Sequence, residues 1–340
     1  MECYGYIKRL VQWKNDPNFW FLNQSPSQTL QQGIKDLDFA FQRFFANPSA
    51  SGYPNWKIKG INDSIRFPQG FSIEERNKRV KLPKLGWIRF KRSRAIKGVV
   101  RHVTITKEAN AYYIVFTTFE ETPDPVLETE SAVGIDLGVK IFAACSDGNV
   151  YHAPVDQYER NERKIKRTQQ KLCRQKKGSK NREKTKLKLS KLHRKLRNTR
   201  LDFTHKLSSG LAKSHGTIYM EDLRVKQMSK SARGTKEKPG VHVRQKAGLN
   251  RSILRQGWGL FRTQLAYKLE AKGGQLILVD PKHTSQTCPV CGHVSKENRT
   301  TQEHFCCVNC GHEANADLNA AKNILLRGKV IRAGHAHCAC

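Results

Sequence analysis

Residues 132–152 read AVGIDLGVKIFAACSDGNVYH and hold two short apolar runs followed by an Asp-Gly pair. Short runs rich in Val, Ile and Ala predict strands, and Asp147-Gly148 predicts the tight turn into a third strand. Asp136 is the only acidic residue inside the first run. A charge in a buried strand costs free energy unless it is paired or binds a cation, although a single aspartate at a strand end more often bonds the local backbone. The stretch therefore predicts a three-stranded meander with a candidate metal-binding carboxylate.

Strands and helices alternate through the chain after residue 131, which indicates an α/β domain. Residues 158–212 carry Lys or Arg on most faces and an apolar stripe at helical spacing, which predicts two helices hinged near Gly178. The apolar run TIYM ends at Glu221, and residues 250–274 predict one helix that stops at a glycine pair before the strand QLILVD. Between them, residues 226–248 are polar and glycine-bearing, which is typical of a mobile loop.

The first 130 residues have a different pattern. Residues 27–45 place Leu, Ile and Phe at helical spacing and predict one amphipathic helix. Residues 64–120 hold short runs rich in β-branched and aromatic residues, broken by Pro or Gly, and predict a small β-barrel or curled sheet. The acidic, proline-bearing residues 121–130 predict a linker to the α/β domain.

Two Cys-x-x-Cys pairs follow the last predicted strand. Their spacing is that of a four-thiolate zinc ribbon, in which each pair closes a tight knuckle that ends in glycine. Cys306 could replace its neighbour, but only Cys307 leaves a two-residue gap to Cys310. Because four thiolates close the coordination sphere, the zinc is expected to be structural, and the nearby His293, His304 and His312 are expected to be polar surface residues. The predicted ligands are Cys288, Cys291, Cys307 and Cys310, and the knuckle glycines are Gly292 and Gly311.

Two further carboxylates could share a site with Asp136. Glu221 ends an apolar strand, and Asp317 opens the helix DLNAAKNIL, where the helix dipole favours an anion and an N-cap role is the simpler interpretation. Three carboxylates on strand ends and a helix start, in a basic protein, are the hard oxygen ligands that a two-metal phosphodiesterase site requires. The residues therefore favour Asp136, Glu221 and Asp317 as ligands of Mg²⁺.

The composition points to a polyanionic partner. The 340 residues include 62 Lys and Arg against 29 Asp and Glu, a formal net charge of +33. Nucleic acid is the commonest polyanion, although a ribosomal or membrane-surface protein would share this charge. No apolar run approaches the roughly 18 residues that span a bilayer, and no secretory leader opens the chain, so export is not expected. Ten cysteines in such a chain favour metal ligation over disulfides.

Several stretches of this sequence resemble the transposon-encoded TnpB (OrfB) family, relatives of the type V CRISPR effectors. They are GIDLGVKIFAACSDG, YMEDLRVKQM, VDPKHTSQTCPVCG and CCVNCGHEANADLNAAKNIL, and HKLSSGLA and KAGLNRSILRQGWGLF also fit the family. The resemblance covers residues 131–328 specifically and runs more loosely back through GYPNWKIKG. It implies an RNase H-like (RuvC) nuclease domain at 131–340 with an embedded four-cysteine zinc ribbon, preceded by a β-barrel-like wedge domain with a small helical insertion.

The resemblance also implies a function. Asp136, Glu221 and Asp317 would be the catalytic ligands of two Mg²⁺ ions in an RNA-guided DNA endonuclease encoded by an insertion sequence. Its partners would be a guide RNA derived from the transposon end and target double-stranded DNA, read beside a short flanking motif. No obligate protein partner and no membrane are expected, and the location is expected to be cytoplasmic, on the nucleoid when DNA is bound. The implied parts are a partial recognition lobe at 1–60, a wedge domain at 61–125, a basic helical region at 158–212 and a zinc ribbon at 284–316. The polar composition of residues 226–248 predicts a lid-like segment over the nuclease site.

One departure from the family pattern concerns the amino end. The chain begins at MECYGYIKRL, inside the family's first helical region, so an opening wedge strand and part of the recognition lobe are expected to be absent. Because the acidic triad is intact, cleavage is the leading hypothesis. The alternative is a cleavage-deficient, RNA-guided DNA-binding protein or transposon regulator. An RNA-binding zinc-ribbon protein without nuclease activity would leave Asp136 and Glu221 unexplained.

Overall fold

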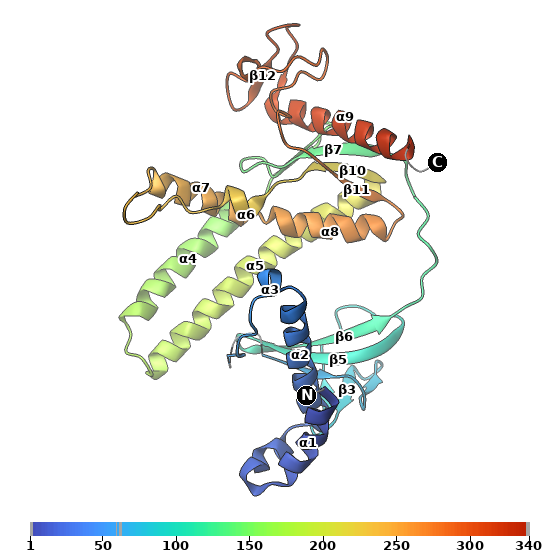
Figure 1. Cartoon of the computed structure of the whole chain (residues 1–340), viewed down its shortest axis with the longest axis vertical. Helices are drawn as coiled ribbons and strands as arrows, with labels where there is room; N and C mark the ends of the chain where they lie inside the picture. The colour runs from blue at the N-terminus through green and yellow to red at the C-terminus, as the bar shows by residue number, and fades with distance from the viewer. Residues whose placement is uncertain (1–2, 59, 61–62, 338–340) are drawn as a thin grey trace. The chain divides into compact units, whose positions relative to one another are not determined.

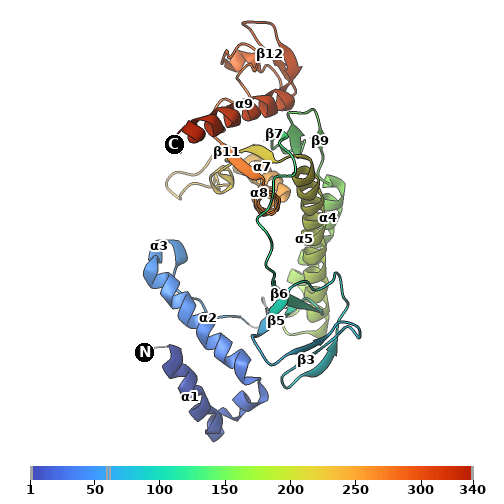
Figure 2. The ribbon, with the colours of Figure 1, turned by 90° about the vertical axis from the view of Figure 1, so that its right-hand side faces the viewer.

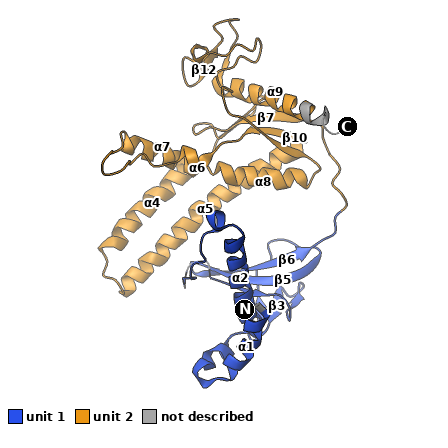
Figure 3. Cartoon of the chain, in the orientation of Figure 1, with its two compact units in different colours: residues 1–122 blue, residues 123–340 orange. Residues whose placement is uncertain are grey.

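A computed structural model of the chain describes residues 3–58, 60 and 63–337. The chain divides into two compact units, residues 1–122 and residues 123–340, each with a hydrophobic core of its own (Figure 3). The division falls inside residues 121–130, the stretch whose composition predicts a linker. No helix within the described residues is long and apolar enough to span a bilayer.

The first unit begins with helices that follow the apolar spacing of the sequence. The helix predicted for residues 27–45 is confirmed as α2 (Ser27–Ala46). Its last two turns place Phe41 and Phe44 against Tyr53, with ring centroids 5.6 and 5.4 Å from the tyrosine ring. The other helices of this unit are α1 (Cys3–Asn15), the 3₁₀ helix η1 (Pro17–Gln24) and the short α3 (Pro48–Ser51).

The β-rich composition of residues 64–120 is confirmed as two three-stranded antiparallel sheets. One has the order β1-β5-β6 and the other the order β2-β3-β4. Their inward side chains share one core, in which Phe67, Val80, Leu82 and Val103 are fully buried. Closure of these sheets into a barrel stays a prediction. The strands are β1 (Ser64–Phe67), β2 (Ser72–Glu74), β3 (Arg79–Leu82), β4 (Gly86–Arg89), β5 (Val99–Glu108) and β6 (Ala111–Phe119).

The second unit is built around a sheet with the strand order β11-β10-β7-β8-β9. The predicted meander is confirmed, because β7 pairs antiparallel with β8, and β8 pairs with β9 across the Asp147-Gly148 turn, where Gly148 has a φ of +94°. The later strands β10 and β11 extend the other side of β7 in parallel register. The strands are β7 (Ala132–Asp136), β8 (Ala143–Cys145), β9 (Val150–Tyr151), β10 (Thr217–Glu221) and β11 (Gln275–Val279).

Helices cover both faces of this sheet (Figure 1). Successive side chains of a strand point to opposite faces. Ile135 and Met220 therefore pack with α5 and α8 in one core, whereas Tyr219 packs with Ile324 of α9 in another. The helices are α4 (Val155–Arg174), α5 (Lys180–Ser214), α6 (Val225–Met228), α7 (Val243–Gln256), α8 (Trp258–Glu270) and α9 (Ala316–His337).

α9 approaches the sheet closely because two glycines leave room at the contact. A Cβ atom on Gly134 of β7 would lie 2.2 Å from the backbone oxygen of Ala321. A Cβ atom on Gly328 of α9 would lie 1.9 Å from the ring of Tyr219 in β10. Interiors packed at this density leave no space for either methyl group. The two glycines therefore fix α9 against β7 and β10, and with it the residues at the start of α9.

The helices before and after β10 differ from the sequence prediction in two respects, the first being that residues 243–248, predicted as the end of a mobile loop, form the first turns of α7. The two helices predicted in residues 158–212 are confirmed as α4 and α5, which lie side by side and are joined through Gly178 with a φ of +80° (Figure 2). The single helix predicted for residues 250–274 is wrong. Gly257 has a left-handed φ of +73° and separates α7 from α8. A Cβ atom there would lie 2.9 Å from Cδ of Arg200, so the break also lets the chain pass close to α5.

Candidate active site and metal-binding knuckles

Asp136 and Glu221 are neighbours at the carboxyl ends of two parallel strands. The register of β7 and β10 pairs the residues that directly precede them. Because side chains alternate along a strand, each carboxylate lies on the same face as the residue two positions earlier, which is Gly134 or Tyr219. α9 covers this face at both of those residues. The fold therefore directs both carboxylates toward the side of the sheet where α9 packs.

Asp317 lies in the first turn of α9. The N-cap role considered for it belongs to Asn315, whose Oδ1 accepts hydrogen bonds from the backbone N–H groups of Asp317 and Leu318 at 3.0 and 3.3 Å. The carboxylate of Asp317 is thus not used as the helix cap, and its charge acts on Asp136. The structure brings the three predicted carboxylates together from β7, β10 and α9.

Glu221 and Asp317 disfavour the charged form of Asp136. Burial, followed by the charges of Glu221 and Asp317, raises the pKa of Asp136 to about 7. Burial also raises the pKa of Glu221 and that of Asp317. A bound cation stabilises buried like charges of this kind. The site therefore has the electrostatics expected of a cation-binding acidic cluster.

Thr284, which no sequence pattern marks, holds Glu221. Its hydroxyl donates to Oε1 of Glu221 at 2.5 Å, and both residues are buried, at 3% and 8% exposure. This hydrogen bond lowers the pKa of Glu221 and so partly offsets the effect of burial. Thr284 follows β11 and precedes the first knuckle, so the residue that orients Glu221 belongs to the entry of the cysteine-rich region.

A polar ridge on α9 holds the loop that carries Thr284. Its three side chains lie four residues apart on one face of the helix and donate to backbone oxygens of residues 280–287. Asn323, for example, donates to the carbonyl oxygen of Thr284 at 2.9 Å. We refer to these side chains as the α9 ridge, which consists of Asn319, Asn323 and Arg327.

Arg299 is a second neighbour of the triad that sequence patterns do not mark. Its Nη2 lies 3.6 Å from Oδ1 of Asp317, and its charge lowers the pKa of both Asp136 and Asp317. Arg299 follows the 3₁₀ helix η2 (Lys296–Asn298) between the two knuckles. Because guanidinium groups bind phosphate as well as carboxylate, Arg299 is suited to contact a phosphate at this site.

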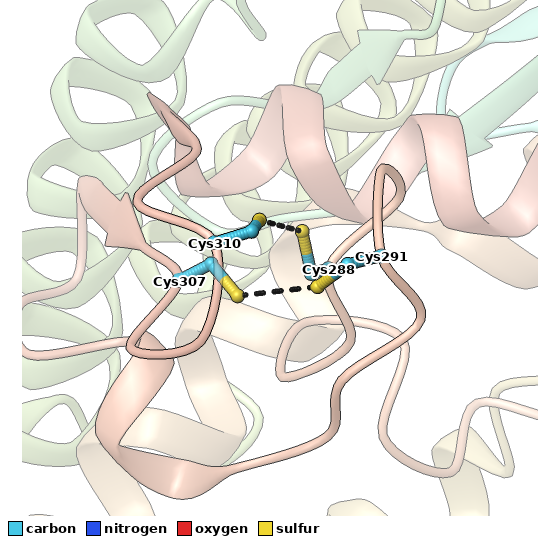
Figure 4. A group of neighbouring side chains, drawn as sticks. All are labelled: Cys288, Cys291, Cys307 and Cys310. Carbon is cyan, nitrogen blue, oxygen red and sulfur yellow. Dashed lines mark hydrogen bonds between the residues drawn. The ribbon is translucent and has the colours of Figure 1, made fainter.

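The four cysteines form one cluster (Figure 4). The Sγ–Sγ distance is 3.6 Å both for Cys288 and Cys310 and for Cys291 and Cys307, and all four sulfur atoms lie within 4.8 Å of one another. Four sulfur atoms at 2.3 Å from a tetrahedral zinc ion would be about 3.8 Å apart, so the cluster fits zinc. Across the described residues, no other group of three or more His, Cys, Asp or Glu side chains is close enough to hold one ion. The three carboxylates interact electrostatically but are more widely spaced.

Each knuckle is closed by its glycine. The backbone N–H of Gly292 donates to the carbonyl oxygen of Cys288 at 3.0 Å, and that of Gly311 donates to Cys307 at 2.9 Å. Both glycines have positive φ values, +75° and +69°, which glycine adopts without steric cost. The hairpin after the first knuckle is formed by β12 (His304–Cys306) and β13 (Glu313–Asn315).

The positions of the sulfur atoms separate the cluster cysteines from Cys306. A backbone hydrogen bond at His293 lowers the pKa of Cys291 to about 6, which favours the thiolate form that binds metal. Cys306 lies outside the cluster, and its sulfur instead contacts Oε1 of Glu313 at 3.8 Å. The structure thus places Cys307, not Cys306, with the other three cysteines.

Two family models match the chain. Residues 115–232 match OrfB_IS605, described as a probable transposase, and residues 258–324 match the Cas12f1-like TNB domain. The first match contains Asp136 and Glu221, and the second contains Asp317 together with the four clustered cysteines. The candidate site residues of the second unit therefore fall inside the matched segments.

A solved structure shares the fold. The chain matches a protein chain of the "Cryo-EM structure of the Cas12f1-sgRNA-target DNA complex" with a TM-score of 0.50 and 16% sequence identity. The match covers 88% of this chain and 70% of that chain. At this identity the likeness concerns the fold alone.

Two curated relatives match over most of their length. The "Putative RNA-guided DNA endonuclease InsQ" of Escherichia coli (strain K12) is 46% identical over 331 residues, which are 97% of this chain and 80% of the relative. The "Putative RNA-guided DNA endonuclease" of Streptomyces pristinaespiralis is 30% identical over 94% of this chain and 76% of the relative. Identity of this extent across nearly the whole chain shows common ancestry. The chain therefore belongs to the TnpB (OrfB) family of RNA-guided DNA endonucleases.

Proposed function

We propose that this chain is a Mg²⁺-dependent, RNA-guided DNA endonuclease encoded by an insertion sequence, which cuts beside a short flanking motif by two-metal phosphodiester hydrolysis. The observation that carries the chemistry is the convergence of Asp136, Glu221 and Asp317 on one electrostatically coupled site. Their oxygens are the hard ligands that Mg²⁺ prefers. The burial that raises their pKa values is offset when a divalent cation binds.

The residues around the triad prepare it for this reaction. Bound Mg²⁺ would activate a water molecule and stabilise the leaving oxygen. Thr284 donates to one oxygen of Glu221 and leaves the other oxygen available to a cation. Arg299 places a positive charge beside Asp317, where a substrate phosphate can share it. Near neutral pH, the proton that Asp136 retains in the absence of a cation is released as the cation binds.

The four cysteines are proposed to hold one structural zinc ion. A closed set of four thiolates leaves no open position for substrate, so this ion takes no part in the reaction. Its role follows from what lies on either side of the cluster in the chain. Thr284 precedes the first knuckle, and Asp317 follows the second, so zinc binding fixes the two segments that position Glu221 and the third carboxylate.

The strand order supports an RNase H-like (RuvC) assignment for the nuclease unit. Three antiparallel strands, β7 to β9, are followed by β10 and β11, which add in parallel beside β7. Residues 1–60 are assigned to a partial recognition lobe, residues 61–125 to a wedge domain and residues 226–248 to a lid. The two compact units and the fold shared with the Cas12f1 chain support this division.

The charge distribution supports guide RNA and double-stranded DNA as partners. A cavity of about 810 Å³ in the second unit is lined by residues of α4, α5, α7 and the segment between α6 and α7. Glu162 is the only carboxylate in its wall, and it already pairs with Arg255 at 2.8 Å. The remaining cations are free to meet phosphate groups. The arginines of this cavity are Arg200, Arg233, Arg244, Arg251 and Arg255.

The deciding experiment is cleavage of a plasmid library with a fixed target beside randomised flanks, by protein expressed with the RNA encoded next to its gene. Metal-dependent cutting beside one flanking motif, lost in EDTA, is the expected result. A purified complex that retains RNA and occupies its target without breaking a strand would instead support the cleavage-deficient regulator.

A further inference from the structure

A hollow of about 320 Å³ adjoins the acidic site and is not used by the chemistry above. Its wall includes Glu221 and Leu137, the residue after Asp136, so the hollow and the triad share one edge of the sheet. The loop that follows β10 and the first turns of α8 form the rest of the wall. The volume is that of a small part of a ligand, not of a whole macromolecule.

The hollow is lined by three cations. Arg224 and Lys226 are exposed in the segment after β10. Nη1 of Arg262 lies 2.7 Å from Oδ1 of Asp222, but both side chains remain more than two-fifths exposed. Exposed ion pairs of this kind are weak, so Arg262 can exchange Asp222 for a stronger anionic partner. Three cations against the two carboxylates of Glu221 and Asp222 leave the lining with a formal net charge of +1, which favours an anion.

A buried donor in the same wall has no acceptor. Trp258 is 5% exposed and lines the hollow, and its indole Nε1–H has no hydrogen-bond partner among the described residues. Buried polar groups in folded proteins are nearly always paired, so an orphaned donor beside a hollow indicates an acceptor that arrives with a ligand.

The start of α8 adds a third feature. The helix begins at Trp258 with no side-chain cap and no acidic residue in its first turn. A Cβ atom on Gly259, which also lines the hollow, would meet nothing within 4 Å. The positive end of the helix dipole therefore lies in the wall of the hollow without an acidic side chain of its own helix, and helix starts of this kind often bind phosphate.

We infer that this hollow binds the backbone phosphate of a nucleotide next to the scissile bond in the DNA strand that is cut. The identity of the strand rests on the proposed function. A strand whose reacting phosphate lies at Glu221 runs beside the hollow, because Glu221 lines the hollow and also acts on Asp136. The phosphate supplies negative charge to Arg262 and the helix start, and an oxygen acceptor to the indole N–H.

The test removes the charge of one DNA linkage and one protein cation at a time. Targets that carry a single neutral methylphosphonate linkage, placed in turn at each position around the cut, are cleaved in single turnover by wild-type protein and by Arg262→Gln. At one flanking linkage, each change alone is expected to slow cleavage about tenfold, and both together are expected to slow it no further. Losses that multiply at every linkage, or wild-type rates for Arg262→Gln, overturn the inference.

Two further variants make the result specific. Trp258→Phe keeps an aromatic ring and removes the indole N–H. This variant is expected to cleave a few-fold more slowly than the wild type, and only when the same linkage carries its natural phosphate. The control is Lys213→Gln, which removes a charge from the exposed end of α5. Any loss in cleavage rate caused by this variant should multiply with the loss caused by the neutral linkage, at every position of that linkage. A linkage-independent loss in Trp258→Phe counts against a contact with the phosphate.

A binding measurement separates this inference from the proposed chemistry. The affinity of the RNA-loaded Asp136→Ala protein for the same modified targets is measured in EDTA, with and without Arg262→Gln. If this cycle shows coupling at one linkage but wild-type protein never cuts, the phosphate subsite stands and the nuclease proposal falls. If the wild-type protein cuts and the cycle shows no coupling, the nuclease proposal stands and the phosphate subsite falls.

Discussion

The cysteine cluster and the acidic triad are assembled in opposite ways. The cysteines come from two knuckles whose outer members are 22 residues apart, and each knuckle is closed by a backbone hydrogen bond to its own glycine. The carboxylates come from β7, β10 and α9, which are brought together by a parallel strand pair and a close contact between helix and sheet. The cluster is therefore encoded locally, whereas the triad exists only when the whole unit has folded.

The acidic triad is expected to depend on the cysteine cluster, whereas the cluster is not expected to depend on the triad. Thr284 and Asp317 lie on either side of the knuckles, so a disordered cluster should disturb the triad. The knuckles, in contrast, make no use of the carboxylates to close. Loss of a carboxylate should therefore remove activity and leave the metal in the cluster, and loss of the cluster should remove both.

Asp136→Ala should have the largest effect on activity. Removing a ligand of the catalytic cation should lower the single-turnover cleavage rate by about 10³-fold or more, while zinc per chain stays at the wild-type value. Cleavage assays and elemental analysis of the same preparation check both halves. A variant that still cuts within tenfold of the wild-type rate would falsify the assignment of Asp136.

Cys307→Ser tests whether the acidic site depends on the cysteine cluster. It should release zinc and lower cleavage by about a hundredfold, because the segments before and after the cluster lose their anchor. Cys306→Ser is the matched control, since Cys306 lies beside Cys307 but outside the cluster, and it should keep both zinc and activity. Equal zinc contents in the two variants would remove Cys307 from the ligand set.

Asp136→Asn should stabilise the metal-free protein in a pH-dependent manner. The pKa of Asp136 is about 7 in the folded protein, against about 3.9 in an unfolded chain, so the folded state holds the proton more tightly. The wild-type carboxyl group therefore costs stability progressively as the pH rises from 4 to 8, and asparagine does not.

In EDTA, the free energy of unfolding of Asp136→Asn should exceed that of the wild type by on the order of 2 kcal/mol at pH 8, and by almost nothing at pH 4. Urea unfolding at the two pH values measures this difference, with the wild type as reference. A gain of the same size at both pH values would show that it does not arise from ionisation.

Thr284→Val should have the smallest effect of the series. The substitution keeps the shape of the side chain but removes the donor to Glu221, and about a tenfold loss in cleavage rate is expected, with a higher Mg²⁺ concentration needed for half-maximal cutting. Thr284→Ser retains the hydroxyl and should restore most of the rate. A loss of equal size in both variants, at unchanged Mg²⁺ dependence, would point to packing and not to the hydrogen bond.

The parts of the molecule that sequence predicts are those with local signals. The Asp147-Gly148 turn, the hinge at Gly178 and the knuckle glycines follow from backbone conformations that few residues other than glycine adopt. The break at Gly257 was not predicted because the apolar spacing continues across it, and a lone glycine within such spacing does not end a helix by itself. A Cβ atom at Gly257 would lie 2.9 Å from Cδ of Arg200, and this tertiary constraint is not visible in the apolar spacing.

The same distinction applies to the site. Three carboxylates stand out in the sequence because they end apolar runs or open a helix, and the structure brings them together. Thr284 and Arg299 act through contacts between segments that are distant in the chain or that lie in loops without periodicity, so no pattern marks them. The cap at Asn315 also needed the structure, because Asn315 and Asp317 are both suitable residues at a helix start.

The position of α9 sets when this protein can become active during its own synthesis. Within the second unit, β7, α4, α5 and β10 emerge from the ribosome before α9, so these elements can fold before α9 exists. Until α9 has been made, the face of the sheet that carries Asp136 and Glu221 lacks its covering helix, the α9 ridge and the third carboxylate. If the proposed function holds, translation therefore delays strand cutting until the basic helices that precede the site have already been available to RNA.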